Sequence, residues 1–200
     1  ISLTTPIEDK ISQIEAKHAL KFLLKRGITL DDIKKYNIGF CITGPYKDRV
    51  IIPSYDENAS VNYFIARAYK DGIQKYKNPP TDAKSAIGWE LYINWDAPII
   101  LVEGVFDALT VKRNVIPLFG KIIHEKLMQK LVRSTVNRIY IALDPDAIKN
   151  ALKHAELLRN MNPKYLSVCD CFEIAAHIYD ENTYGIVSDK VDVALCGHDS

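Results

Sequence analysis

Two short acidic stretches decide the fold of this chain: Leu-Val-Glu-Gly-Val-Phe-Asp at residues 101–107 and Ile-Ala-Leu-Asp-Pro-Asp at residues 141–146. Each closes an apolar run that is typical of a buried strand. In an open parallel sheet, ligands bind just beyond the carboxyl ends of the strands, so acids at two such ends share one site. We therefore expect these carboxylates to hold Mg²⁺, which prefers oxygen ligands.

Length and composition limit the class of protein. The 200 residues are 48% hydrophobic and 26% charged, which suits one good core or two small ones and argues against disorder. No apolar run approaches the ~18 residues of a membrane span, and the first residues lack the pattern of a signal peptide. These features predict a soluble, cytoplasmic protein with no membrane partner. The first residue is Ile rather than Met, which indicates a fragment of something longer.

Charge is distributed unevenly along the chain. The formal net charge is +1, but residues 170–200 carry seven acidic residues against Lys190 alone, a net charge of −6. Residues 1–169 therefore carry +7. A moderately basic body of this kind suits a polyanionic partner, although ordinary solvated surfaces also carry such an excess.

The first part of the chain reads as a small mixed α/β unit. Helical periodicity covers residues 7–26 and 30–36, and strand-like runs cover residues 49–53 and 61–68. We expect this N-terminal subdomain to extend over residues 1–95.

From residue 96 onward, strands alternate with helices. The runs predicted as strands are 99–102, 115–119, 138–143 and 165–168, and those predicted as helices are 105–113, 124–133 and 148–160. Alternation at this length predicts right-handed crossovers and a parallel sheet. We expect this second domain at residues 96–169, followed by an acidic C-terminal segment of unknown role at residues 170–200.

The acidic motifs resemble those of a known family. The pattern E-G-x-x-D at residues 103–107, followed about forty residues later by D-x-D at residues 144–146, is similar to the toprim domain of bacterial-type and phage DNA primases. Further similar stretches follow in the family's order, at residues 23–28, 38–40, 49–56, 64–67, 75–80 and 118–121. The resemblance implies a toprim-like parallel sheet flanked by helices, after a smaller mixed α/β subdomain.

The same resemblance implies a set of catalytic acids. Glu103, Asp144 and Asp146 are expected to be catalytic and to hold Mg²⁺, or Mn²⁺ in its place, with Asp107 and Asp170 as further ligands. Glu103 either completes the coordination or acts as general base, and the sequence leaves both roles open. The alternative for the acids at the strand ends is a capping role, because such carboxylates often satisfy the first amides of the following helix. For Asp107, which falls inside the predicted helix, the alternative is a solvated side chain or an indirect role near the metal.

A basic stretch lies before these motifs. Between residues 67 and 84, five basic residues face two acidic ones, and two tyrosines are interleaved. This composition is typical of a surface that tracks phosphates and stacks bases, and a solvated loop is the alternative. The residues expected to contact nucleotide or DNA are Arg67, Lys75, Lys77, Asn78 and Lys121.

These features predict the catalytic core of a DNA primase. The expected reaction is the Mg²⁺-dependent synthesis of short RNA primers from nucleoside triphosphates on single-stranded DNA during replication, in a bacterial cell or a phage-infected host. An upstream zinc-binding domain and a replicative helicase partner are family features that this sequence leaves open. Two alternatives remain: a toprim nuclease or topoisomerase-like cleavage by the same acids, and an inactive nucleic-acid-binding module, in which Lys149 replaces a family glycine.

Overall fold

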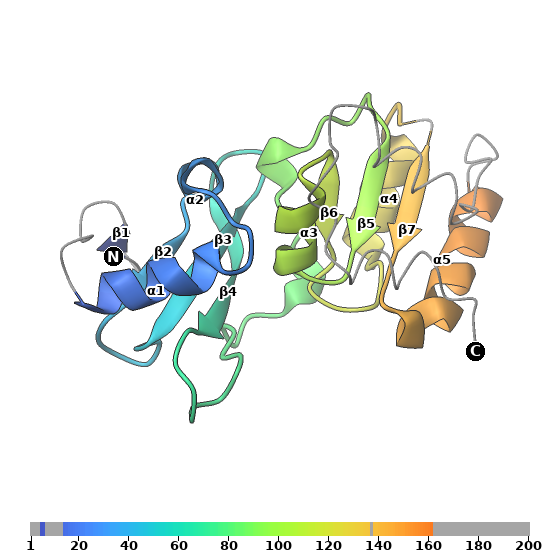
Figure 1. Ribbon diagram of the computed structural model, residues 1–200. Helices are drawn as coiled ribbons and strands as arrows, with labels where there is room; N and C mark the ends of the chain where they lie inside the picture. The colour runs from blue at the N-terminus through green and yellow to red at the C-terminus, as the bar shows by residue number, and fades with distance from the viewer. Residues whose placement is uncertain (1–4, 7–13, 137, 162–200) are drawn as a thin grey trace. The chain divides into compact units, whose positions relative to one another are not determined.

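The computed structural model describes residues 5–6, 14–136 and 138–161 (Figure 1). The chain divides into two compact units, Ile1–Thr81 and Asp82–Ser200. The first unit holds an antiparallel sheet and the second a parallel sheet, each with helices, which confirms the predicted mixed α/β class. The strand expected at residues 165–168, Asp170 and the acidic segment 170–200 lie outside the described residues.

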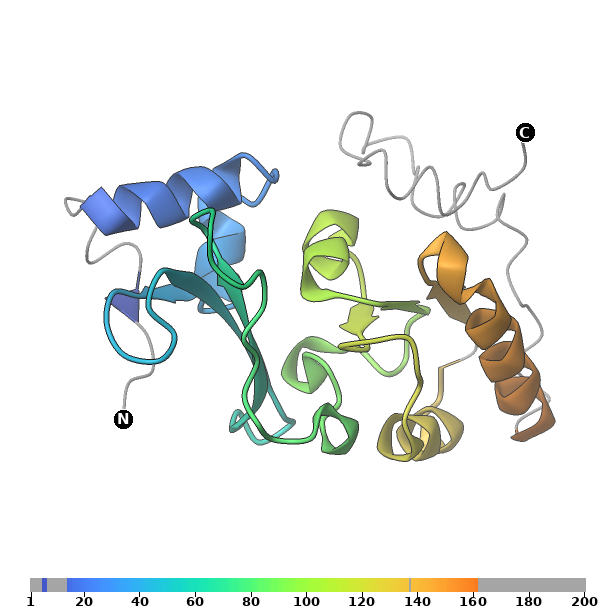
Figure 2. The same ribbon diagram turned by 90° about the horizontal axis from the view of Figure 1, so that it is seen from below.

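The described residues of the first unit form a four-stranded antiparallel sheet in the order β1-β2-β3-β4, with two helices. The strands are β1 (Thr5–Pro6), β2 (Gly39–Cys41), β3 (Arg49–Tyr55) and β4 (Val61–Ala68), and the helices are α1 (Ile14–Leu24) and α2 (Leu30–Lys35). Figure 2 shows α1 lying along one face of this sheet. Helix α1 buries Ala16, Ala19 and Leu23, which recur at helical spacing along one stripe.

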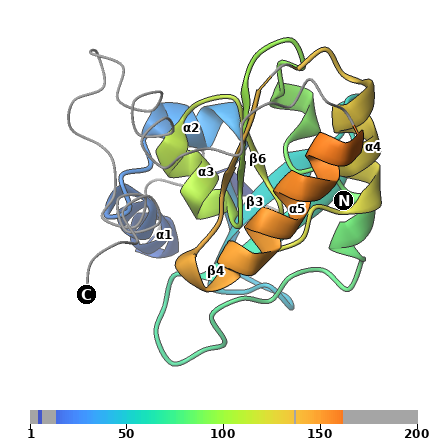
Figure 3. The ribbon, with the colours of Figure 1, turned by 90° about the vertical axis from the view of Figure 1, so that its right-hand side faces the viewer.

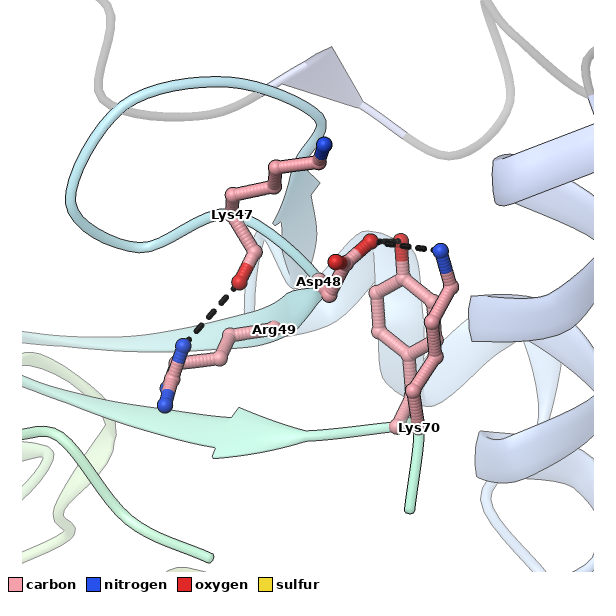
Figure 4. A network of polar contacts seen from close by, with 5 residues as sticks. Lys47, Asp48, Arg49 and Lys70 are labelled. Carbon is pink, nitrogen blue, oxygen red and sulfur yellow. Dashed lines mark hydrogen bonds and ion pairs between the residues drawn. The ribbon is translucent and has the colours of Figure 1, made fainter. Parts of the chain in front are cut away.

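The loops beside the β3–β4 hairpin are held by polar contacts (Figure 4). Arg49 is 7% exposed and donates hydrogen bonds to the carbonyls of Lys47 and Gln74, each at 3.0 Å. The Lys70 Nζ lies 2.7 Å from Asp48 Oδ1. A buried guanidinium needs such acceptors, because leaving it without them is costly. These contacts tie the basic stretch at Lys70 and Gln74 to the residues at the start of β3.

The second unit contains a three-stranded parallel sheet in the order β6-β5-β7. The strands are β5 (Ile99–Val102), β6 (Val115–Pro117) and β7 (Ile139–Ala142), and the helices are α3 (Val105–Val111), α4 (Glu125–Arg133) and α5 (Ile148–Met161). The strands point the same way in Figure 1, and Figure 3 shows α3 on one face of the sheet and α4 and α5 on the other. Every residue of β5 is buried, as expected for a central strand covered on both faces.

The described part of the second unit also contains short 3₁₀ helices at Ala83–Ser85, Glu90–Tyr92 and Pro145–Ala147. Ile87 is 1% exposed and belongs to the same apolar cluster as Ile99 and Leu101, and Trp95 packs against that cluster. Residues 82–95, which the expected boundary at residue 95 assigns to the N-terminal subdomain, thus pack with the second unit. Among the described residues, no helix is both long and apolar enough to cross a membrane.

Candidate active site

Three acidic side chains meet at one edge of the parallel sheet. Glu103 directly follows β5, and Asp144 and Asp146 follow its neighbour β7. One carboxylate oxygen from each lies within 4.8 Å of the other two. Glu103 is half-buried and the two aspartates are exposed. Oxygen donors at this spacing, open on one side, fit a hard divalent cation that keeps part of its water shell.

A backbone amide at the end of β7 orients the Glu103 carboxylate at the end of β5. The Asp144 N–H donates a hydrogen bond of 3.0 Å to Glu103 Oε1. Burial raises the pKa of Glu103 above its ordinary value, and the negative charges of Asp144 and Asp146 add to the rise. The Asp144 amide and the Lys121 ammonium oppose the rise in pKa. Glu103 is therefore suited to binding a cation or a proton.

Asp107 has a different surrounding. Its Oδ2 accepts a hydrogen bond of 3.1 Å from the Gly104 N–H and caps the first turn of α3. Asp107 is not part of the three-acid cluster found among the described residues. Asp107 thus caps α3 and lies outside the acid cluster, whereas Asp170 lies outside the described residues.

Lys121, one of the residues predicted to bind phosphate, lies on the loop between β6 and α4. Its ammonium forms an ion pair with the Asp146 carboxylate. This hydrogen bond is the main reason that the pKa of Lys121 is raised, with the three acidic charges contributing in the same direction. The structure thus places Lys121 beside the candidate metal site.

His154 supports this loop, and nothing in the sequence analysis assigns it a role. It is 6% exposed on α5, and its Nε2 accepts a hydrogen bond of 3.2 Å from the Ile123 N–H. Burial lowers the pKa of His154, the charges of Lys153 and His124 lower it further, and the Lys121 backbone opposes them. The one available signal was its place near Ala155 and Leu158 on the buried stripe of α5.

The lowered pKa of His154 predicts a pH-dependent stability. The unfolded chain takes up the proton more readily, so this contribution to the free energy of unfolding is complete above the ordinary pKa of 6.5 and is lost as the pH falls below it. We expect urea unfolding to show a larger loss of stability from about pH 7.5 to about pH 5.5 in the wild type than in His154→Gln, which keeps an acceptor but does not titrate. Equal losses in both proteins would contradict this expectation.

A cluster of cations and aromatic rings lies in the first unit. The Arg67 guanidinium lies 4.7 Å from the centre of the Tyr76 ring and 5.9 Å from that of Phe22, and Arg26 lies 4.7 Å from the Phe22 ring. The Arg67 Nε is buried without a hydrogen-bond partner in the described part of the chain. Burial and the charge of Arg67 lower the pKa of Arg26. Two neighbouring guanidiniums favour the binding of an anion between them. The aromatic rings offer faces on which nucleic-acid bases can stack.

The other predicted contacts of the first unit lie at aromatic rings or on the β3–β4 hairpin. Lys75 Nζ lies 5.8 Å from the centre of the Tyr76 ring, and Lys77 Nζ lies 5.9 Å from that of Tyr46. Asn78 has a structural contact, because its Oδ1 accepts a hydrogen bond of 3.4 Å from the Ala66 N–H at the end of β4. Arg67 and Lys75 thus share the Tyr76 ring, whereas Lys77 lies at a separate ring, Tyr46, and Asn78 extends the hydrogen bonding of the hairpin.

The contact between Arg67 and single-stranded DNA that the sequence predicts can be tested by removing this side chain. We expect Arg67→Ala to weaken binding by about 1 kcal/mol, which is roughly fivefold in affinity. We also expect the slope of log affinity against log salt concentration to become shallower by about 0.7. Fluorescence anisotropy with a labelled oligonucleotide at several salt concentrations measures both. Lys17→Ala, which removes an exposed charge from α1, is the control, and an equal loss in both variants would argue against a specific contact.

The fold of this chain is that of primase catalytic domains. It superposes on part of a structure of Aquifex aeolicus primase that contains the zinc-binding and RNA polymerase domains, with a TM-score of 0.62, 21% identity and coverage of 76% of this chain. For the DnaG primase catalytic domain bound to single-stranded DNA, the TM-score is 0.63, the identity 18% and the coverage 74%. For the primase fragment of the bacteriophage T7 primase-helicase, the values are 0.53, 20% and 68%. The chain spans 48%, 61% and 59% of those three structures.

Similar sequences carry no assigned activity. Uncharacterized protein MG010 of Mycoplasma genitalium is 28% identical over 182 residues, which cover 86% of this chain and 81% of that protein. Its Mycoplasma pneumoniae homolog is 28% identical over 137 residues, or 64% of this chain and 63% of that protein. No protein-family profile matches the chain. The predicted resemblance to primase catalytic cores is therefore confirmed by structural similarity, at the level of the fold.

Proposed function

We propose that this chain is the catalytic core of a DNA primase, which joins nucleoside triphosphates into short RNA primers on single-stranded DNA in the presence of Mg²⁺ or Mn²⁺. The observation that carries the proposal is the meeting of Glu103, Asp144 and Asp146 within 4.8 Å. Structural similarity to primase catalytic domains supports it, including one whose structure contains single-stranded DNA.

The acids suit the chemistry of nucleotidyl transfer. Attack of a hydroxyl on an α-phosphate builds negative charge on the phosphate oxygens and on the departing pyrophosphate. A divalent cation supplies the positive charge that stabilises those oxygens. Asp144 and Asp146 would hold that cation at the end of β7. Glu103, oriented by the Asp144 amide, would either complete the coordination or accept the proton of the attacking hydroxyl.

The basic surface of the first unit supplies contacts for the polyanionic substrates. Arg67 and Lys75 lie over the Tyr76 ring, so a phosphate at the cations and a base on a ring are held by neighbouring groups. We propose the single-stranded template and the incoming nucleotide as the ligands of this surface.

A primer-synthesis assay tests the proposed activity. The purified chain is incubated with single-stranded DNA, the four ribonucleoside triphosphates and Mg²⁺, and labelled products are separated by length. We expect short oligoribonucleotides that disappear when a chelator removes the cation. Metal-dependent nicking without nucleotide incorporation would favour the nuclease alternative. DNA binding with neither activity would favour the inactive binding module.

A further inference from the structure

Lys121 occupies an unusual position for a phosphate-binding residue, because its ammonium is already paired with one of the three clustered acids. Its partner is Asp146, and both side chains remain partly exposed, Lys121 at 39% and Asp146 at 72%. An ammonium at this carboxylate partly neutralises the charge of the cluster. A divalent cation at the same oxygens would therefore meet a positive charge beside it.

The backbone holds Lys121 in this place. The Gly120 N–H donates a hydrogen bond of 3.1 Å to the carbonyl of Glu103 itself, and the Ile123 N–H donates to His154 Nε2 on α5. The loop that carries Lys121 is thus hydrogen-bonded on one side to the end of β5 and on the other side to α5, the helix that follows Asp146. The nearness of Lys121 to the acids comes from the fold of the loop as well as from the reach of a flexible side chain.

We propose that Lys121 is an internal counter-ion of the acid cluster, which a divalent cation displaces from Asp146 and which then binds the phosphates of the incoming nucleotide. This inference rests on the proposed function, since it takes the three acids as the metal site. Displacement frees an ammonium with three donors next to the cation, where a triphosphate places its negative oxygens. Loading of the cation and binding of the nucleotide are thereby coupled.

The proposal predicts opposite effects of one substitution on two ligands. Lys121→Met keeps an unbranched side chain only one atom shorter and removes its charge. We expect it to raise the affinity for Mn²⁺ alone by about tenfold, within the range usual for coupled sites. We expect it to lower the affinity for a fluorescent ATP analogue at saturating Mn²⁺ by a similar factor. Damage to the fold would lower both affinities, so the opposite signs identify the displaced ammonium.

Binding of Mn²⁺ is measured from the electron paramagnetic resonance signal of the free ion, and nucleotide binding from fluorescence. Lys121→Arg keeps the charge and is expected to resemble the wild type. Lys126→Met removes an exposed charge from α4 and is expected to change neither affinity. An unchanged or lower Mn²⁺ affinity in Lys121→Met would overturn the counter-ion role. Unchanged nucleotide affinity would overturn the transfer of Lys121 to the phosphates.

The same titration separates this inference from the proposed function. The Asp144→Asn, Asp146→Asn variant is expected to lose Mn²⁺ binding. If it binds Mn²⁺ as well as the wild type, the acid cluster is not the metal site and the proposed function loses its main support. If it loses Mn²⁺ binding while Lys121→Met behaves like the wild type, the metal site stands and the counter-ion role alone is overturned.

Discussion

We expect the Asp144→Asn, Asp146→Asn variant to lower the rate of the proposed magnesium-dependent primer synthesis about 1,000-fold and to leave the proposed binding of single-stranded DNA as tight as in the wild type. Cation stabilisation of developing charge amounts to several kcal/mol, and about 4 kcal/mol corresponds to this factor. Asparagine keeps the size of aspartate and removes its charge, so the strand end is preserved. The rate of primer synthesis at saturating substrate and the anisotropy of a labelled oligonucleotide are the two measurements.

A control with the same change in net charge separates a local effect from a general one. Glu125→Gln, Glu156→Gln alters two exposed acids of the second unit and is expected to retain primer synthesis. If the double aspartate variant loses DNA affinity in parallel with activity, its effect comes from the fold or from the overall charge. If it keeps its activity, the cluster at the ends of β5 and β7 is not the catalytic centre.

Gly88→Ala is expected to destabilise the second unit by about 3 kcal/mol, the upper end of the usual cost of overpacking. A Cβ at Gly88 would lie 2.0 Å from the Pro117 carbonyl oxygen and 2.9 Å from Pro117 Cγ. The first of these atoms belongs to the backbone of β6, so relief requires a shift of a sheet strand. Trp89 and Trp95, the two tryptophans of the chain, lie in the second unit, and their fluorescence during urea unfolding reports its stability.

Gly44→Ala is the comparison for this experiment. Gly44 has φ of +71° and nothing lies within 4 Å of an added Cβ, so its substitution carries only the cost of a left-handed backbone, about 1 kcal/mol. A tryptophan-monitored transition that is no lower in Gly88→Ala than in Gly44→Ala would show that the close approach to β6 is relaxed at little cost.

The candidate site illustrates how far local patterns reach. Glu103, Asp144 and Asp146 were predictable, because short motifs at strand ends and the parallel alternation of elements place them at one sheet edge. Asp107 shows the limit of such patterns, since the same motif position serves as a helix cap. His154 was not predictable, because its hydrogen bond to the Ile123 amide joins residues 31 positions apart, and no local pattern encodes such a distance.

The primary structure was sufficient for the mixed α/β class, the parallel order of the second half and the acidic residues that follow its strands. These features follow from the spacing of apolar residues and from the residue types at turns and strand ends. Both are properties of residues that are close together in the chain. Packing in three dimensions settled the rest: Ile87 and Trp95 joined the second unit, and Lys121 came to lie against Asp146. Those contacts depend on which distant segments bury each other, and the free energy of that burial is a property of the whole fold.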